Sequence, residues 1–141
     1  MPSLPQDEAR RRLAAARIAR LATVRTDGRP HVVPVVFAVD GNTIHLVADP
    51  KPKDSLDLLR HRNIAANPAV SLLVDEYHEP WRGIWWVRVD GTARVVEEGT
   101  ERDRTIELLR AKYADYEEWT TPFGAATIIA AERWRSWTME G

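Results

Sequence analysis

The sequence predicts a mainly β fold of the α+β class, in which six or seven antiparallel strands and three helices form a small Greek-key barrel. Two observations predict it. Strand-like runs are separated by Asp-Gly pairs, which favour tight hairpin turns because glycine accepts a positive φ. No Gly-x-Gly-x-x-Gly motif follows a strand and no Walker-type loop occurs, so a doubly wound nucleotide-binding fold does not fit. A length of 141 residues suits one domain, residues 1–141.

The first half of the chain is expected to hold one helix and three strands. Leu4 to Arg20 has apolar residues at helical spacing, with acids early, where the helix dipole favours them. Pro34 inside the second strand indicates a sheet edge or a bulge, because proline cannot donate a ladder hydrogen bond. The expected strands are 20–24, 31–39 and 43–48, with turns at Asp27-Gly28 and Asp40-Gly41.

The second half is expected to hold two helices and the remaining strands. Pro50 and Pro52 fix an extended backbone before a short helix, which Asp54 or Ser55 caps. Thr100 with Asp103 resembles a capping box that opens a helix reaching about Tyr113. The expected strands are 69–75, 84–89, 92–97, 125–131 and 133–139, of which 84–89 and 92–97 form a hairpin about Asp90-Gly91.

Composition excludes several classes of function. The chain has no cysteine, which excludes disulfides, thiolate metal sites and a cysteine nucleophile. A net charge of −1 lacks the basic excess of a duplex-binding protein, so no nucleic-acid partner is expected. No apolar stretch approaches the roughly 20 residues of a membrane span, and we expect a cytoplasmic protein. The four histidines have no metal-ligand spacing, so no metal is expected.

Lysines gather where the middle helix begins. Lys51-Pro52-Lys53-Asp54-Ser55 leads into this helix, whose first backbone N–H groups are unpaired and carry partial positive charge. Two ammonium groups beside such a terminus make a phosphate site. The alternative is a charged surface loop with an ordinary Asp or Ser cap.

Tryptophans and arginines form two further clusters. Trp85 and Trp86 are adjacent on a strand and point to opposite faces, so one of them lies against a partner subunit, a flat cofactor ring or the core. Arginines recur in the first helix, where they form either a solvated face or a surface for an acidic ligand. These arginines are Arg10, Arg11, Arg12, Arg17 and Arg20.

Several motifs resemble one protein family. They are Leu21-Ala22-Thr23-Val24, Asp27-Gly28-Arg29-Pro30-His31, Pro34-Val35-Val36-Phe37, Lys51-Pro52-Lys53, Asn63-Ile64-Ala65-Ala66-Asn67-Pro68, Trp85-Trp86-Val87-Arg88-Val89-Asp90-Gly91 and Arg133-Trp134. Together they are similar to proteins related to pyridoxamine phosphate oxidase, and more narrowly to the actinobacterial branch that uses coenzyme F420. The resemblance covers nearly the whole chain.

The resemblance implies a split β-barrel homodimer with two cofactor sites at the subunit interface. The cofactor ring is then expected along Val33, Pro34, Val35, Val47, Ala48 and Asp49. Its phosphate is expected at Lys53 first, then at Lys51 and Ser55. The loop from Tyr77 to Trp85 of the partner subunit would cover the ring.

The resemblance implies an oxidoreductase that transfers a hydride between coenzyme F420 and a small organic substrate. A flavin-type cofactor carries the hydride chemistry itself, and the sequence assigns no catalytic residue; Tyr77 and His78 are candidate proton donors. The alternatives are an FMN-binding enzyme of the same fold and a non-catalytic cofactor carrier, with heme binding a more distant option. Arginines in the first helix favour F420, because its glutamate tail is acidic and FMN has no such tail.

Overall fold

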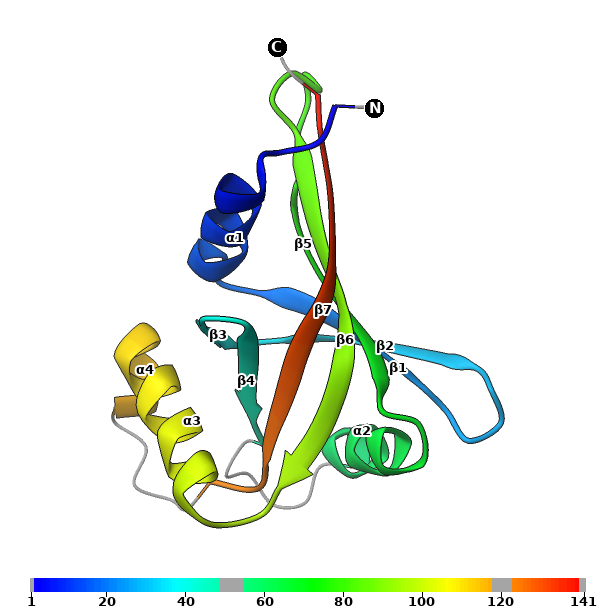
Figure 1. The fold of residues 1–141 in the computed structure, drawn as a ribbon, viewed down its shortest axis with the longest axis vertical. Helices are drawn as coiled ribbons and strands as arrows, with labels where there is room; N and C mark the ends of the chain where they lie inside the picture. Colours follow the sequence, from blue (N-terminus) through cyan, green and yellow to red (C-terminus); the bar gives the residue numbers. More distant parts are fainter. Residues whose placement is uncertain (1, 49–54, 118–122, 140–141) are drawn as a thin grey trace.

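The computed structural model describes residues 2–48, 55–117 and 123–139, with the side chains of 55–58 and 117 left aside (Figure 1). The elements, in chain order, are α1 (Gln6–Ala15), β1 (Ala19–Val24), β2 (Pro30–Val35), β3 (Ala38–Asp40), β4 (Thr43–Val47), α2 (Ser55–Ala66), β5 (Ala69–Glu76), β6 (Trp85–Val96), α3 (Thr100–Lys112), α4 (Ala114–Glu117) and β7 (Ala126–Thr138).

The strands form one antiparallel sheet in the order β2-β1-β5-β6-β7-β4-β3. This confirms the antiparallel α+β class. β2 and β3 lie at opposite edges of the sheet, yet only Val36 and Phe37 separate them along the chain. Three peptide units reach at most ~11 Å. The sheet must therefore curl until its two edges meet at this two-residue crossing.

The crossing is held by the residue that follows α3. Phe37 is fully buried, and its N–H donates to the Tyr113 hydroxyl oxygen at 3.2 Å. The same hydroxyl lies 3.0 Å from the carbonyl oxygen of Phe37 and 2.9 Å from that of Arg17, and its single proton serves one of them at a time. One side chain thus ties the crossing to the start of β1 and to the end of α3.

Lys112 adds a second contact to the crossing. Its Nζ lies 3.9 Å from the centroid of the Phe37 ring and makes no hydrogen bond to the part of the chain that the structure describes. Burial first, and then the nearby Arg17 guanidinium, lower the pKa of Lys112 to about 8. The ammonium is therefore stabilised by an aromatic face rather than by a carboxylate.

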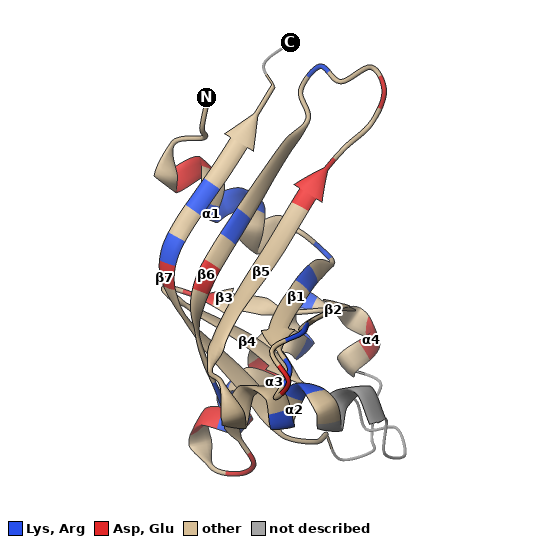
Figure 2. Cartoon of the chain, turned by 90° about the vertical axis from the view of Figure 1, so that its right-hand side faces the viewer, with Lys and Arg blue, Asp and Glu red and all other residues tan. Residues whose placement is uncertain are grey.

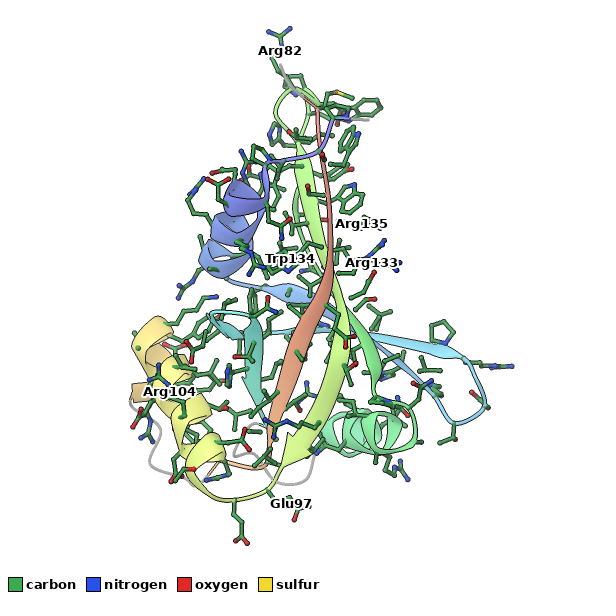
Figure 3. All side chains as sticks on the ribbon, in the orientation of Figure 1. Arg82, Glu97, Arg104, Arg133, Trp134 and Arg135 are labelled. Atoms are coloured by element: carbon green, nitrogen blue, oxygen red, sulfur yellow. The ribbon has the colours of Figure 1, made fainter. Side chains whose placement is uncertain are left out.

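The core fills the concave face of the curled sheet. Side chains alternate along each strand, so that β1 buries Ala19 and Leu21 and exposes Arg20 between them. α1 covers the upper part of this face with Ala9 and Leu13 (Figure 1). Figure 3 shows the same alternation on β7: Trp134 points to the side of α1, and Arg133 and Arg135 to the other. A second cluster joins α3 and α4 to the β3–β4 hairpin; its buried members are Ala38, Val47, Leu109, Tyr116 and Phe123.

The hairpin expected at Asp90-Gly91 is wrong, because β6 runs through this pair as one strand. The register against β7 shifts between Asp90 and Gly91. A Cβ on Gly91 would lie 2.2 Å from the carbonyl oxygen of Ala130, so this glycine permits a close backbone approach instead of a turn. The two closing strands expected on either side of Glu132 are likewise one strand, β7, which pairs with β6 on both sides of the register shift.

Other boundaries also differ from the expectations. α1 ends at Ala15 rather than Arg20, and the long second strand divides at the crossing into β2 and β3. α3 begins after Gly99, whose φ is 104°, with no side-chain cap, so the Thr100–Asp103 capping box is wrong. Pro34 lies on an edge strand, which confirms that prediction. α4 is an additional short helix.

The Tyr113 contacts generate a prediction on stability. Tyr113→Phe leaves the Phe37 N–H without its acceptor, and we expect the free energy of unfolding to fall by about 1–3 kcal/mol. Urea denaturation measures it. Tyr77→Phe is the matched control, since Tyr77 is exposed, and should stay within about 0.5 kcal/mol of the parent protein. Equal stability of both variants would mean that the hydroxyl does not hold the crossing.

Candidate functional site

A pocket of about 710 Å³ lies where the end of α1 and the α1–β1 link face the end of β5 and the start of β6. Figure 1 shows α1 beside this upper part of the sheet, and Figure 2 shows basic residues on α1. Four arginines line the pocket: Arg11, Arg12, Arg17 and Arg20. Asp75, Glu76 and Trp85 line it as well.

The local structure explains why these arginines converge. Arg11 and Arg12 lie in the second half of α1, whose apolar side is anchored in the core by Leu13. Arg17 lies in the link that follows the helix. Arg20 is outward-facing because the alternation of β1 buries its neighbours. An early end of the helix, followed directly by a strand, therefore brings four guanidinium groups to one pocket.

One carboxylate serves two of these arginines. Glu8 accepts hydrogen bonds from Arg11 Nε at 2.9 Å and from Arg12 Nε at 2.7 Å. Hydrogen bonds from Arg11 first, and then from Arg12, lower the pKa of Glu8 to about 2. The carboxylate is thus ionised at any physiological pH, but its single negative charge cannot neutralise both guanidinium groups.

Among the described residues, neither Arg17 nor Arg20 has a carboxylate partner. The Arg17 guanidinium donates to the backbone carbonyl of Lys112 at 2.9 Å and lies 4.6 Å from the centroid of the Tyr113 ring. Arg20 is exposed and makes no hydrogen bond or ion pair with the residues of known placement. Arg20 is therefore open to a ligand, and Arg17 is held in place with further N–H donors beyond the one that bonds Lys112.

Trp85 forms an aromatic part of the pocket wall. The Arg12 guanidinium carbon lies 5.1 Å from the centroid of its ring, and its Nε1 donates to Glu76 Oε2 at 3.3 Å. Trp85 is half-buried and packs against the main core of its own chain. Its expected role in covering a ring in the partner subunit stays a prediction.

The residues expected along a cofactor ring divide into two groups. On β2, Val35 is part of the core and Val33 packs against it, whereas Pro34 is exposed and pairs with Arg20 of the pocket. Val47 and Ala48 are buried, so their side chains do not reach this pocket. Of the residues expected around the ring, the structure therefore places Trp85 in the wall of the arginine pocket and Pro34 next to it, as the cross-strand neighbour of Arg20.

The expected phosphate-binding segment falls largely outside the described residues. Lys51 and Lys53 are not among them, and Ser55 is known only as the first residue of α2. Asp49, which was expected along the ring, also lies outside the described residues. Tyr77, at the end of β5, is exposed, and His78 Nδ1 lies 2.9 Å from the carbonyl oxygen of Pro80. The existence of a helix after the lysine segment is confirmed, and its role at a phosphate stays a prediction.

His45 is held in a buried network under α3. Its Nδ1 lies 2.8 Å from Thr105 Oγ1, and its Nε2 lies 2.9 Å from Thr43 Oγ1. The two hydroxyl oxygens also lie near backbone carbonyl oxygens, that of Thr105 at 3.1 Å from Glu101 and that of Thr43 at 2.8 Å from Asp40. A neutral imidazole has one N–H, so one of the two hydroxyls donates its proton to the ring. Burial is the largest cause lowering the pKa of His45. In the ranges 2–48, 55–117 and 123–139, no group of three or more His, Asp or Glu residues could hold a metal ion.

None of the helices that the structure describes is long and apolar enough to cross a membrane. Sequence reasoning missed the pocket itself. The arginine cluster was the signal in the sequence. The helix expected to reach Arg20 would have placed Arg17 and Arg20 on a helical surface, whereas the early end of α1 places them around the pocket.

Comparisons with known proteins point to one family. The family model described as pyridoxamine 5'-phosphate oxidase matches residues 5–138. A FAD-binding protein from Mesorhizobium loti is 25% identical, with a TM-score of 0.72, over 96% of this chain and 93% of that one. A putative pyridoxamine 5'-phosphate oxidase from Corynebacterium glutamicum is 23% identical, with a TM-score of 0.62, over 98% of each chain. A heme-binding protein from Mycobacterium smegmatis is 20% identical, with a TM-score of 0.74, over 99% of this chain and 57% of that one. No curated protein matches.

The His45 network generates a prediction on pH. Because the pKa is lowered on folding, the unfolded chain binds a proton more readily, and stability falls as the pH drops below the ordinary histidine value of 6.5. We expect His45→Asn to flatten this part of the profile of unfolding free energy against pH. Urea denaturation from pH 8 to pH 5 measures it, and identical slopes for the two proteins would contradict the assignment.

Proposed function

The chain belongs to the pyridoxamine 5'-phosphate oxidase family, and we propose that it is an oxidoreductase that binds an anionic flavin-type cofactor. The cofactor is coenzyme F420, and the reaction transfers a hydride between it and a small organic substrate. The observation that carries this proposal is the basic pocket beside the exposed edge strand β2, in a chain matched by the family over nearly its whole length.

The donor set of the pocket suits such a cofactor. Guanidinium groups bind carboxylates and phosphates in a bidentate geometry. Arg20 is the neighbour of Pro34 across the β1–β2 ladder, so a ring lying along β2 would direct an attached anionic chain towards the pocket. The acidic glutamate tail of F420 provides that chain.

When bound, the deazaflavin supplies the hydride chemistry. The residues of this chain then bind and orient the cofactor and exclude water. Arg20 and Arg17 would hold anionic groups, and the exposed face of Pro34 would support the ring. Of the candidate proton donors, Tyr77 is freely exposed, whereas His78 is held by the Pro80 carbonyl through Nδ1. We therefore favour Tyr77 wherever a proton is needed.

FMN is the second candidate, because proteins similar in structure include one described as FAD-binding. An FMN enzyme would use the same edge strand without needing the arginines. A non-catalytic carrier of F420 is the alternative from outside enzyme chemistry, and turnover with a reducible substrate separates it from an oxidoreductase. Heme is a further candidate ligand, because a heme-binding protein has a similar fold.

We also propose a homodimer. Large apolar side chains outside the pocket are exposed, among them Val32 on the edge strand. Two aromatic side chains, Tyr77 and Trp81, are exposed in the segment after β5. Aromatic and aliphatic residues are typical of the buried centre of a subunit interface. A second subunit at this edge would also supply a wall for a cofactor on β2.

The proposed function predicts a ranking of affinities. In a fluorescence titration of the purified protein, coenzyme F420 should bind more tightly than FMN, and heme should bind most weakly. The physical reason is the additional negative charge of the F420 tail beside uncompensated arginines. Lys53→Ala should weaken F420 binding by roughly 10- to 100-fold, the value of a lost charge-assisted hydrogen bond.

Two outcomes would overturn parts of this proposal. Tighter binding of FMN or heme than of F420 would reject the assigned cofactor. Unchanged F420 affinity in a Lys53→Ala protein of normal melting temperature would remove the lysine segment from the site.

The homodimer predicts a particle of twice the 16.0 kDa chain mass in multi-angle light scattering at micromolar concentration. Val32→Asp should shift the particle towards the chain mass, because a carboxylate at an apolar interface is desolvated without a partner. Arg29→Asp, in the turn of the same hairpin, is the control. A monomeric parent protein would refute the proposal.

A further inference from the structure

We propose that the pocket between α1 and the β5–β6 end of the sheet binds a multiply charged anion, such as an oligocarboxylate or a phosphate ester, joined to an apolar group. In one of its two forms this proposal rests on the proposed function, since the anion is then the acidic tail of the cofactor. In the other form the anion belongs to the substrate. The two sources share one chemistry, and the experiment below distinguishes them.

The pocket has more positively than negatively charged side chains. Four arginines face two carboxylates, and the nearby Glu8 does not remove the excess. Among the described residues, no ion pair joins Asp75 or Glu76 to any of the four arginines. The arginines of the pocket are therefore not neutralised by direct contact with its two carboxylates.

Two of the four arginines are already held in place before a ligand binds. Arg17 is oriented by the Lys112 carbonyl and the Tyr113 ring, and Arg12 by Glu8 and the face of Trp85. Binding therefore immobilises few further rotamers in these two side chains. Arg20, which has no partner in the described ranges, provides the adaptable contact.

The pocket also has an apolar part. Trp85 lies beneath Arg12, and Ile18 lines the pocket with its side chain about half exposed. A purely inorganic ion would leave these groups in water. A ligand with anionic groups on an apolar or planar body covers them, which is why we assign an organic anion instead of free phosphate.

Titration with two probes tests the pocket directly. Tri-γ-glutamate and inorganic pyrophosphate are titrated calorimetrically into the full-length protein at low salt. In Arg17→Gln/Arg20→Gln we expect an affinity for tri-γ-glutamate at least fivefold lower, because two uncompensated charges are lost. In Arg25→Gln/Arg29→Gln, which removes two charges from the distant β1–β2 turn, we expect no change beyond twofold. Raising the salt should weaken binding to the parent protein.

The single variant Arg20→Gln keeps the test valid if loss of the Arg17 contact disturbs folding, because Arg20 has no described partner to lose. Its expected effect on the same probe is at least twofold. Loss of affinity for the probe confined to the pocket variants supports the site. Equal affinity in the pocket and turn variants, or no probe binding to the parent protein, overturns it.

The source of the anion follows from a second pair of titrations. If the pocket variants weaken binding of F420 but not of its tail-less deazaflavin precursor, the pocket holds the cofactor tail. If F420 binds equally well to all variants and does not displace tri-γ-glutamate, the pocket holds an anion of the substrate. A protein that binds no F420 refutes the proposed cofactor, while the probe titration still decides the pocket.

Discussion

The two-residue crossing at Val36 and Phe37 is the constraint on which the rest of the structure depends. It joins the two edge strands of a seven-stranded sheet, so no flat arrangement of these strands is compatible with the chain. The buried Phe37 and the hydroxyl of Tyr113 hold the crossing from inside and from the end of α3. The backbone N–H and C=O groups between two strands belong to neither strand's hydrogen-bond ladder, so a side chain must pair with them when they are buried.

The position of the candidate site follows from that closure. The β1–β2 hairpin puts Pro34 next to Arg20, and the crossing continues from the end of this hairpin. The Tyr113 hydroxyl also meets the Arg17 carbonyl, and the Arg17 guanidinium returns to the carbonyl of Lys112. The link between α1 and β1 is thereby fastened to the same structure that closes the sheet. Closure of the barrel and the geometry of the basic pocket are consequently parts of one set of contacts.

The sequence predicted what local signals determine. The α+β class, the edge position of Pro34 and the helix after the lysine segment follow from turn residues, proline and helical spacing. The turn expected at Asp90-Gly91 did not form, because the glycine serves a close approach to Ala130, which no local pattern reveals. The pocket was not predictable either. It needs α1 to end at Ala15, and it needs residues 65 positions apart, Arg20 and Trp85, to line the same pocket.

The central claim is that the curled sheet presents an edge strand and a basic pocket to one anionic redox cofactor. A crystal structure of the protein with coenzyme F420 bound tests it most directly. The account predicts a ring lying along β2 at Pro34 and an acidic tail extending into the pocket towards Arg17 and Arg20. Density for the cofactor away from β2, with the arginine pocket unoccupied, would contradict the account.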